Sequence, residues 1–327
     1  NLYYRTDIGS KFLSKYEMTG VSIKNGNTAI KSIKNNIIET YNDNVCGNYG
    51  GFGGEYKLND DITLVSSIDG VGTKTIVSLK HFGSKGFINL GKDIVNHSIN
   101  DILVQGAYPL YFLDYYGTSN LNTNELSYFI KGVSEACIEN GKFPILGGET
   151  AEMPLVYKEH TTDLVGCIVG LKNPMFFKNK IIKNSKIIGF SSNGPHTNGF
   201  SLINKIENID NTIVKTLLNP HTCYLKLVKT LVEKYGYDFI LGMAHITGGG
   251  LIENISRVIP DDLNLEITYT LPLPEWCQYL SKKLSLSKKE MLNVYNCGIG
   301  FVLIIDPEFI NKINKTEFDY IDLGLII

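Results

Sequence analysis

Long apolar runs, paired cysteines and an excess of basic charge are all missing from this sequence of 327 residues. No apolar run reaches the roughly 18 residues of a membrane-spanning helix, so we expect no membrane partner. The six cysteines include no CxxC pair, which argues against a structural zinc site and a disulfide framework and favours a reducing compartment. The first residues lack a signal-peptide core. We therefore expect a cytoplasmic protein, and an organelle-targeting segment removed during processing stays an alternative.

The charge of the chain is nearly balanced. Lys and Arg number 31 against 33 Asp and Glu, which gives a net charge of -2. Nucleic-acid binding normally needs a cationic surface, so we expect no nucleic-acid partner. Hydrophobic residues at 43% and charged residues at 20% are typical of a globular protein, and the length suits two domains of about 150 residues each.

Strand and helix patterns alternate along the chain. Short runs rich in β-branched and aromatic residues, bounded by Gly, Asn or Pro, predict strands at 62–69, 108–117, 143–149, 164–172, 186–194 and 298–306. Apolar residues spaced three and four apart predict helices over 93–105 and 123–141. The polar segment 171–184, which contains Pro174, separates two regions. We predict a mixed α/β fold with an N-terminal domain over 1–170 and a C-terminal domain over 171–327.

The segment GNYGGFGGEY at 47–56 is rich in glycine. Such a segment is either a flap whose backbone amides wrap a phosphate, with Gly51 and Gly53 as the closest residues, or an irregular loop. It does not follow the dinucleotide-binding pattern of glycines between a strand and a helix. A flap that closes only over substrate would exclude water from a reactive phosphate intermediate.

The segment SSIDGVGTK places a carboxylate, two glycines and a lysine at the end of a predicted strand. Asp69 could bind Mg²⁺, and Lys74 could contact a phosphate, with Gly70 and Gly72 in the turn between them. The alternative is an ordinary turn, because Asp-Gly pairs are common in turns. The segment is not a P-loop, since Lys74 follows Thr73 instead of a glycine.

The predicted helix from Asp93 has a polar face opposite its apolar stripe. Asp93, His97, Asn100 and Asp101 recur at steps of three and four residues and therefore share this face. The face is either solvated or a site for a hard cation, because it has oxygen ligands and no basic residue that would neutralise them. Asp93 at the expected helix start could instead cap free amides.

Three further motifs combine glycines with polar side chains. GGETAEMP sets Gly147, Gly148 and Glu149 at the end of a strand, where α/β proteins collect ligands. GPHTNGFSL and AHITGGGL each place a glycine turn before a predicted helix, where backbone amides can hold an anion. His196 in the first turn could donate or shuttle a proton, whereas His245 beside the second stays ambiguous.

These motifs, taken in order, resemble the aminoimidazole ribonucleotide synthetase family, the phosphoribosylformylglycinamidine cyclo-ligases. The resemblance runs through YEMTGVSIKNGN, GGFGGEY, SSIDGVGTK, QGAYPLYFLDYY, GGETAEMP, GPHTNGFSL, AHITGGGLIENISRVIP and NCGIGFVLI, and thus covers nearly the whole chain. It implies a homodimer in which the N-terminal domain forms a β-barrel core with its partner. It also implies ATP and Mg²⁺ as cosubstrate and cofactor, and formylglycinamidine ribonucleotide as the substrate that is cyclised to aminoimidazole ribonucleotide.

The resemblance implies roles for individual residues of this sequence. His97 receives none, because Asn96, His97 and Ser98 stand where the family more often has small or apolar residues. The catalytic residues implied are His196, Asp93 and Lys74, and the implied metal ligands are Asp69, Asp93, Asp101 and Glu149. ATP and its phosphates are assigned to Gly51, Gly53, Asp69, Gly70, Gly72, Lys74, Gly147 and Gly148, and the substrate to Asn198, Gly199, Thr247, Gly248, Gly249 and Gly250.

Related activities were weighed against the same residues. Selenophosphate synthetase would need a Cys-Lys pair that does not follow Cys46, and a hydrogenase-maturation dehydratase would need a C-terminal cysteine. Formylglycinamidine ribonucleotide synthetase resembles a doubled and much longer chain, and thiamine-monophosphate kinase lacks the GGETAEMP segment. A non-catalytic nucleotide-binding dimer would not need the carboxylates, His196 and two glycine turns together.

Overall fold

The computed structural model of the protein describes residues 23–47, 49–268 and 273–327. The first part of the YEMTGVSIKNGN motif, up to residue 22, lies outside the described residues. The first helix, α1 (Ile23–Ile38), precedes two sheets of six and five strands. Within the described ranges, no helix is long and apolar enough to cross a membrane.

The first sheet has the strand order β1-β2-β3-β6-β4-β5. Its neighbouring strands are antiparallel except β4 and β5, which run parallel. The sheet is open, because β1 and β5 lie at opposite edges and do not pair with each other. Its strands are β1 (Val45–Cys46), β2 (Gly54–Lys57), β3 (Thr63–Gly70), β4 (Ala107–Thr118), β5 (Ile145–Glu152) and β6 (Thr162–Lys172).

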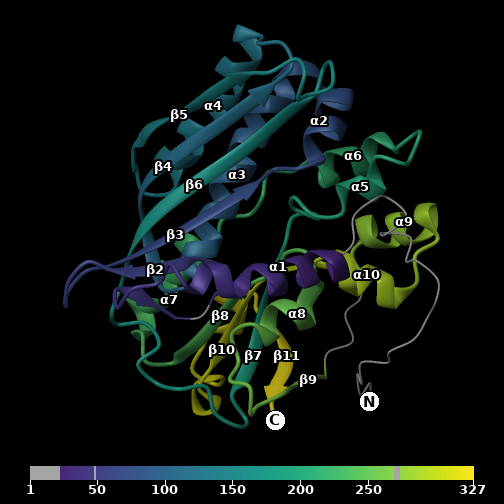
Figure 1. The fold of residues 1–327 in the computed structure, drawn as a ribbon. Helices are drawn as coiled ribbons and strands as arrows, with labels where there is room; N and C mark the ends of the chain where they lie inside the picture. Colours follow the sequence, from purple (N-terminus) through teal and green to yellow (C-terminus); the bar gives the residue numbers. More distant parts are fainter. Residues whose placement is uncertain (1–22, 48, 269–272) are drawn as a thin grey trace.

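In the described part of the chain, a layer of helices covers one face of this sheet (Figure 1). They are α2 (Lys74–Phe82), the short 3₁₀ helix η2 (Gly83–Lys85), α3 (Gly86–Leu103) and α4 (Thr123–Glu139). Alternate residues of a strand point to opposite faces, so Val65 and Ser67 of β3 are buried toward the helices whereas Ile68 is 71% exposed. The opposite face of the sheet is therefore open and carries apolar side chains.

The second sheet is antiparallel, with the order β8-β10-β7-β11-β9. Every residue of β10 is buried, as expected for an apolar strand in the middle of a sheet. The strands are β7 (Lys186–Ser191), β8 (Ile240–His245), β9 (Leu265–Ile267), β10 (Ile299–Ile305) and β11 (Ile321–Ile326). The helices that accompany them are α5 (Phe200–Ile203), α6 (Asn211–Leu217), α7 (Leu225–Tyr235), α8 (Gly250–Ser256), α9 (Glu275–Leu284), α10 (Lys288–Val294), η3 (Pro307–Phe309) and α11 (Lys315–Phe318).

The structure confirms the predicted strands and corrects one helix. Each of the six predicted segments forms a strand, and α4 occupies the predicted range. However, α3 begins at Gly86 and not at Asp93 as predicted, so Asp93 lies in the middle of this helix and the capping alternative is wrong. Seven earlier residues, 86–92, extend the helix because Phe87 and Leu90 continue the apolar stripe against the sheet and are fully buried.

Two glycines let α3 and α4 approach each other closely. A Cβ added at Gly91 would collide with the carbonyl oxygen of Phe129, and one added at Gly132 with the carbonyl oxygen of Ile88. Because both obstacles are backbone atoms, neither can move aside without shifting a helix.

We predict that Gly132→Ala destabilises the protein by about 1–3 kcal/mol, because the added methyl group forces α4 away from α3. Gly26→Ala in α1 is the matched control, since nothing lies within 4 Å of the position of its Cβ. That change removes a helical glycine and should leave stability unchanged or raise it by up to about 1 kcal/mol. Guanidinium chloride unfolding measures both, and equal effects of the two variants would contradict the packing argument.

Candidate functional site

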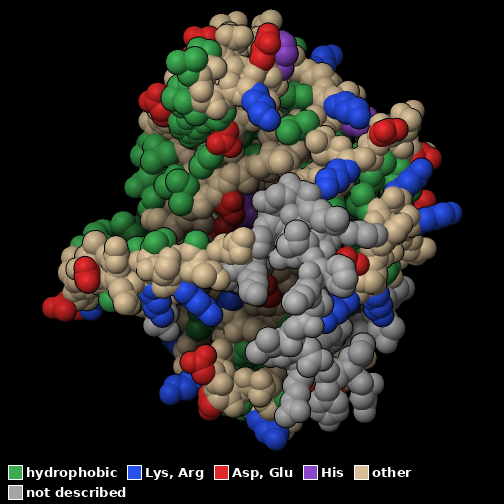
Figure 2. Space-filling model, turned by 45° about the vertical axis from the view of Figure 1, so that its right-hand side comes forward, with side chains coloured by type: hydrophobic (Ala, Val, Ile, Leu, Met, Phe, Trp, Pro, Cys, Tyr) green, Lys and Arg blue, Asp and Glu red, His purple; other side chains and the backbone are tan. Residues whose placement is uncertain are grey.

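A cavity of about 410 Å³ lies where loops of the two sheets meet. Figure 2 shows acidic and histidine side chains recessed between the two halves of the molecule. Three loops line the cavity: one after β3, one before α5 and one after β8. Its lining residues are Asp69, Gly70, Val71, Gly72, Thr73, His97, Thr197, Asn198, Gly199, Phe200, Ser201, Thr247 and Gly248.

The lining loops depend on glycine at two turns. Gly72 has φ +65° between β3 and α2, and Gly249 has φ +93° immediately before α8. Both angles lie in the left-handed region, which glycine adopts without steric penalty. Residues of the DGVG, HTNG and TGGG segments thus line one cavity, with Thr247 and Gly248 as the contribution of the last segment.

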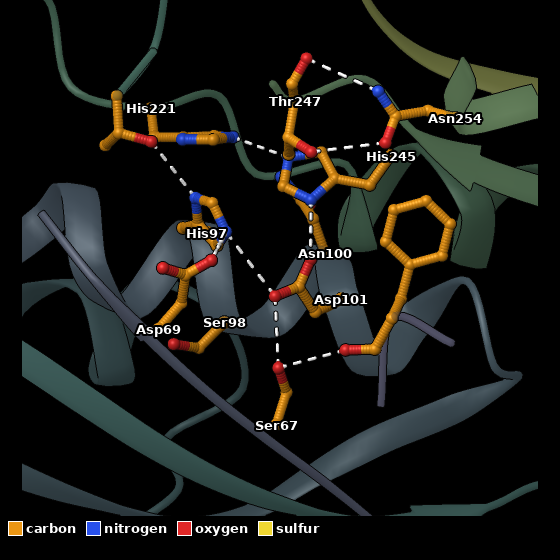
Figure 3. A network of polar contacts seen from close by, with 12 residues as sticks. Ser67, Asp69, His97, Ser98, Asn100, Asp101, His221, His245, Thr247 and Asn254 are labelled. Carbon is orange, nitrogen blue, oxygen red and sulfur yellow. Dashed lines mark hydrogen bonds and ion pairs between the residues drawn. The ribbon is translucent and has the colours of Figure 1, made fainter. Parts of the chain in front are cut away.

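A histidine–carboxylate cluster lies beside the cavity (Figure 3), and we define it as Asp69, His97, Asp101, His221 and His245. His97 Nε2 lies 2.9 Å from Asp69 Oδ2 and 3.4 Å from Asp101 Oδ2. His245 Nδ1 lies 2.8 Å from Asp101 Oδ1. His221 Nε2 and His245 Nε2 are 2.8 Å apart. The cluster is a continuous chain of polar contacts from the cavity into the second sheet.

The carboxylates of the cluster favour a charged His97. Burial opposes this charge, but Asp101 and Asp69 outweigh it and raise the pKa of His97 well above its usual value. Burial likewise opposes ionisation of Asp101, but His97 and His245 outweigh it and lower the pKa of Asp101. Asp69 also has a lowered pKa, since His97 outweighs its burial. The centre of the cluster is therefore a cation held between two anions.

The other two histidines of the cluster favour the neutral form. Burial lowers the pKa of His221 well below its usual value, and it lowers the pKa of His245 although Asp101 opposes this. A carboxylate only accepts hydrogen bonds, so the proton of neutral His245 belongs on Nδ1. His245 Nε2 then accepts from His221 Nε2, which leaves His221 Nδ1 unprotonated. This nitrogen is buried and has no hydrogen-bond partner among the described residues.

Ser67 connects the cluster to the glycine-rich segment. Its hydroxyl lies 3.1 Å from both Asp101 Oδ2 and the carbonyl oxygen of Phe52. The amide of Gln105 also donates to the carbonyl oxygen of Gly53 at 3.1 Å. Gly51 and Gly53, predicted to contact ATP phosphates, are thus held at the edge of the histidine–carboxylate cluster.

Lys74 and Asp93 lie away from the cavity and form a buried ion pair. Lys74 Nζ is 2.7 Å from Asp93 Oδ1, and the same oxygen accepts from the backbone N–H of His221 at 2.7 Å. Lys74 also donates to the carbonyl oxygen of Asn219 at 2.7 Å. Burial raises the pKa of Asp93 to about 6 and lowers that of Lys74. This correction gives both residues a structural contact in place of the phosphate and metal contacts predicted for them.

Two asparagines of α3 bind the same loop between α6 and α7. Asn96 donates to the carbonyl oxygen of His221 at 2.7 Å, and Asn100 donates to that of Thr222 at 2.8 Å. Asn100 Oδ1 also accepts from the backbone N–H of Tyr224. The polar face of α3 is therefore buried instead of solvated, and most of its residues do not face a metal site. Its greater part is a contact between the two sheets.

Glu149 lies on the opposite face of the first sheet. It pairs with Tyr115 of β4, whereas the next residue, Tyr116, is buried against Phe87 and Phe129 of the helices. Because neighbours along a strand point to opposite faces, the side chain of Glu149 points away from α3 and is exposed. Within the protomer, it does not join Asp69 and Asp101, so its metal role stays a prediction.

His196 is buried and does not line the cavity, although the next residues, Thr197 and Asn198, do. Its ring stacks on that of His221 with the centroids 3.9 Å apart. Neither ring nitrogen has a hydrogen-bond partner among the described residues, and burial lowers its pKa well below the usual value. The proton transfer predicted for His196 has no partner in this arrangement.

The sequence prediction gave no role to two residues of the histidine–carboxylate cluster and left a third, His245, ambiguous. His97 was given no role, although its spacing of four from Asp101 on the polar face of one helix was a usable signal. No local pattern marks His221. The composition offers a weaker signal, because four of the six histidines converge here from distant segments: His97, His196, His221 and His245.

Comparison with known proteins gives two family matches and close relatives. Residues 50–171 match the AIR synthase related protein N-terminal domain, and residues 183–316 match the C-terminal domain of the same family. A phosphoribosylformylglycinamidine cyclo-ligase of Lawsonia intracellularis is 40% identical, over 91% of this chain and 88% of the relative. That of Nitratidesulfovibrio vulgaris is 37% identical, over 91% and 89%.

Solved structures with lower identity share the fold. Thiamine monophosphate kinase from Aquifex aeolicus is 15% identical with a TM-score of 0.63, covering 94% of this chain and 95% of the kinase. AaThiL complexed with AMPPCP and TMP is 15% identical with a TM-score of 0.65, covering 94% and 92%. At this identity, the likeness concerns the fold alone.

The buried ion pair leads to a stability prediction. Asp93→Asn should destabilise the protein by about 3–5 kcal/mol, because Lys74 then keeps a buried charge without its partner. The matched control is Asp60→Asn, which removes the equally short but exposed pair with Lys57 and should cause no measurable change. Urea unfolding at neutral pH without nucleotide compares the two. Wild-type stability of Asp93→Asn would refute the structural role.

Proposed function

Since the chain belongs to the phosphoribosylformylglycinamidine cyclo-ligase family, we propose that the cavity between its two sheets is the site of ring closure. The protein is a ligase of purine biosynthesis. It uses ATP to cyclise formylglycinamidine ribonucleotide to aminoimidazole ribonucleotide, with release of ADP and phosphate. The observation that carries the location is the convergence of three loops on one cavity that Asp69 lines.

The reaction needs an activated oxygen and a held nucleophile. The γ-phosphoryl group of ATP moves to the formyl amide oxygen, which turns that oxygen into a good leaving group. The amidine nitrogen then attacks the same carbon, a C–N bond forms, and the C–O bond breaks with loss of phosphate. Both reacting groups belong to one molecule, so the protein mainly holds them in a geometry that favours closure.

Asp69 fits the role of a Mg²⁺ ligand better than the other predicted carboxylates. It lines the cavity and its side chain is 49% exposed, whereas the side chain of Asp101 is only 6% exposed. Carboxylate oxygens are the ligands that Mg²⁺ prefers. When bound, Mg²⁺ would neutralise charge on the ATP phosphates. His97 holds a proton between Asp69 and Asp101 and thereby limits their mutual repulsion.

The two glycine turns suit the phosphate groups of the ligands. Thr247, Gly248, Asn198 and Gly199 line the same cavity as Asp69. Backbone amides in such turns bind anions without adding positive charge. In this proposal, they hold the substrate, and the DGVG turn with Gly51 and Gly53 lies on the nucleotide side. The proposed division of labour places the nucleotide on 1–170 and much of the substrate contact on 171–327.

The open face of the first sheet supports a homodimer. Ile68 is 71% exposed there, and Val165 and Cys167 of β6 lie beside it with partly exposed side chains. A sheet that covers one face with helices normally buries its other apolar face too. In this proposal, two protomers join these faces and close the β-barrel core implied by the family resemblance.

The activity assignment predicts that the purified protein releases ADP and phosphate with formylglycinamidine ribonucleotide and not with thiamine monophosphate. Asp69→Asn should lower kcat by roughly 100-fold or more, because a charge that opposes the phosphates and holds Mg²⁺ is lost. Asp322→Asn, a carboxylate exposed on β11, is the control and should retain the full rate. Unchanged turnover of Asp69→Asn would remove Asp69 from the site.

The dimer proposal predicts that Ile68→Glu shifts the protein to a monomer, because a charge is then placed in the apolar interface. Ile182→Glu is the matched control, since Ile182 is 54% exposed in the segment between the two sheets. Light scattering coupled to gel filtration gives the mass of each variant. A wild-type dimer with an unchanged Ile68→Glu dimer would place the interface elsewhere.

A further inference from the structure

We propose that His97, His221 and His245 form a binding site for a transition-metal ion such as Zn²⁺. One ligand atom from each side chain lies within 4.8 Å of the other two, and all three residues are buried. They come from α3, from the loop after α6 and from the end of β8. The site adjoins the proposed Mg²⁺ ligand, because His97 Nε2 lies 2.9 Å from Asp69 Oδ2. It differs from the Mg²⁺ and ATP contacts in its donors, which are nitrogens instead of carboxylate oxygens and backbone amides.

The spacing of the three rings suits a tetrahedral ion. The ring centroids of His97 and His221 are 5.0 Å apart, and each of these centroids lies 4.9 Å from that of His245. Three imidazoles that bind one Zn²⁺ with bonds of about 2.0–2.1 Å have centroids about 5 Å apart. The rings therefore already stand at the separation of a three-histidine site.

The nitrogens need only a small adjustment. His221 Nε2 and His245 Nε2 are 2.8 Å apart, whereas two ligands of a tetrahedral Zn²⁺ are about 3.4 Å apart. The proton of His221 can move from Nε2 to Nδ1, which is buried and has no hydrogen-bond partner among the described residues. This shift frees both facing nitrogens for the ion. His97 joins them when the ion displaces the proton that its ring holds between Asp69 and Asp101.

Asp101 supplies the outer contact that metal-binding histidines commonly have. Its Oδ1 accepts from His245 Nδ1 at 2.8 Å and thereby directs Nε2 of the same ring toward His221. A carboxylate in this position fixes the tautomer of a ligand and raises its basicity. His97 lines the cavity, so an ion reaches the cluster from there.

The donor set selects the class of metal. Imidazole nitrogens suit Zn²⁺, Ni²⁺ and Cu²⁺, whereas Mg²⁺ prefers oxygen ligands and keeps its waters. Binding should therefore persist in excess Mg²⁺ and without nucleotide or substrate. This separates the inference from the proposed reaction, because either can fail while the other holds.

The test uses the full chain without a histidine tag, stripped with a chelator and kept in excess Mg²⁺. Calorimetry with Zn²⁺ should show one ion per chain, and Co²⁺ should give the visible absorption bands of a tetrahedral site. His221→Gln should weaken binding by on the order of 100-fold, at least as much as loss of an outer contact. His160→Gln is the matched control, since the His160 side chain is 88% exposed outside the cluster.

The variants are chosen so that folding does not obscure the result. The loop around His221 is held through its backbone N–H and carbonyl groups, which His221→Gln retains. His245→Gln removes a second ligand and should weaken binding equally, and thermal unfolding without metal checks that each variant is folded. The proposal is overturned if the wild type binds no Zn²⁺, or if folded His221→Gln and His245→Gln bind it as tightly as the wild type.

Discussion

The contact between Lys74 and Asp93 fixes the relation between the two sheets. Both side chains are fully buried, so the free energy lost by removing two charges from water must be offset by short, well-directed contacts. Oδ1 of Asp93 accepts from the lysine and from the backbone N–H of His221, and Lys74 adds the carbonyl oxygen of Asn219. Oδ2 of Asp93 is buried without a hydrogen-bond partner among the described residues. The ion pair thereby ties α2 and α3 to a loop that belongs to the second sheet.

Helix α3 carries this contact into the site. Asn96 and Asn100 bind the loop that contains His221, while His97 and Asp101 on the next positions face the cavity and His245. The opposite side of the helix packs on the first sheet through fully buried residues such as Ile94. One helix therefore sets the distances between residues from three remote segments, which is what a site built between two sheets requires.

The sequence predicted the type and place of many helices and strands, but it did not predict which side chains contact one another. Six of the eleven described strands were predicted, because each is a short run rich in β-branched or aromatic residues and such composition is a local property. The buried strand β8 was not predicted. The polar face of α3 was ambiguous because a solvated face, a metal site and an interdomain contact all need polar residues at the same spacing. Glu149 illustrates the same limit: the face to which a strand residue points depends on pairing with β4, which the segment itself does not encode.

The loop that carries His196 shows how the buried contacts serve the cavity. His196 has φ +60°, a left-handed conformation that is uncommon for residues other than glycine, although histidine adopts it more often than most. Such a conformation costs about 1–3 kcal/mol and persists only where the surroundings enforce it. Here the stacked ring of His221 does so, and His221 is itself held by Asp93. The buried ion pair thus holds His221, the His221 ring packs on His196, and His196 precedes Thr197 and Asn198 in the cavity wall. The ion pair therefore positions the cavity wall although neither of its residues lines the cavity.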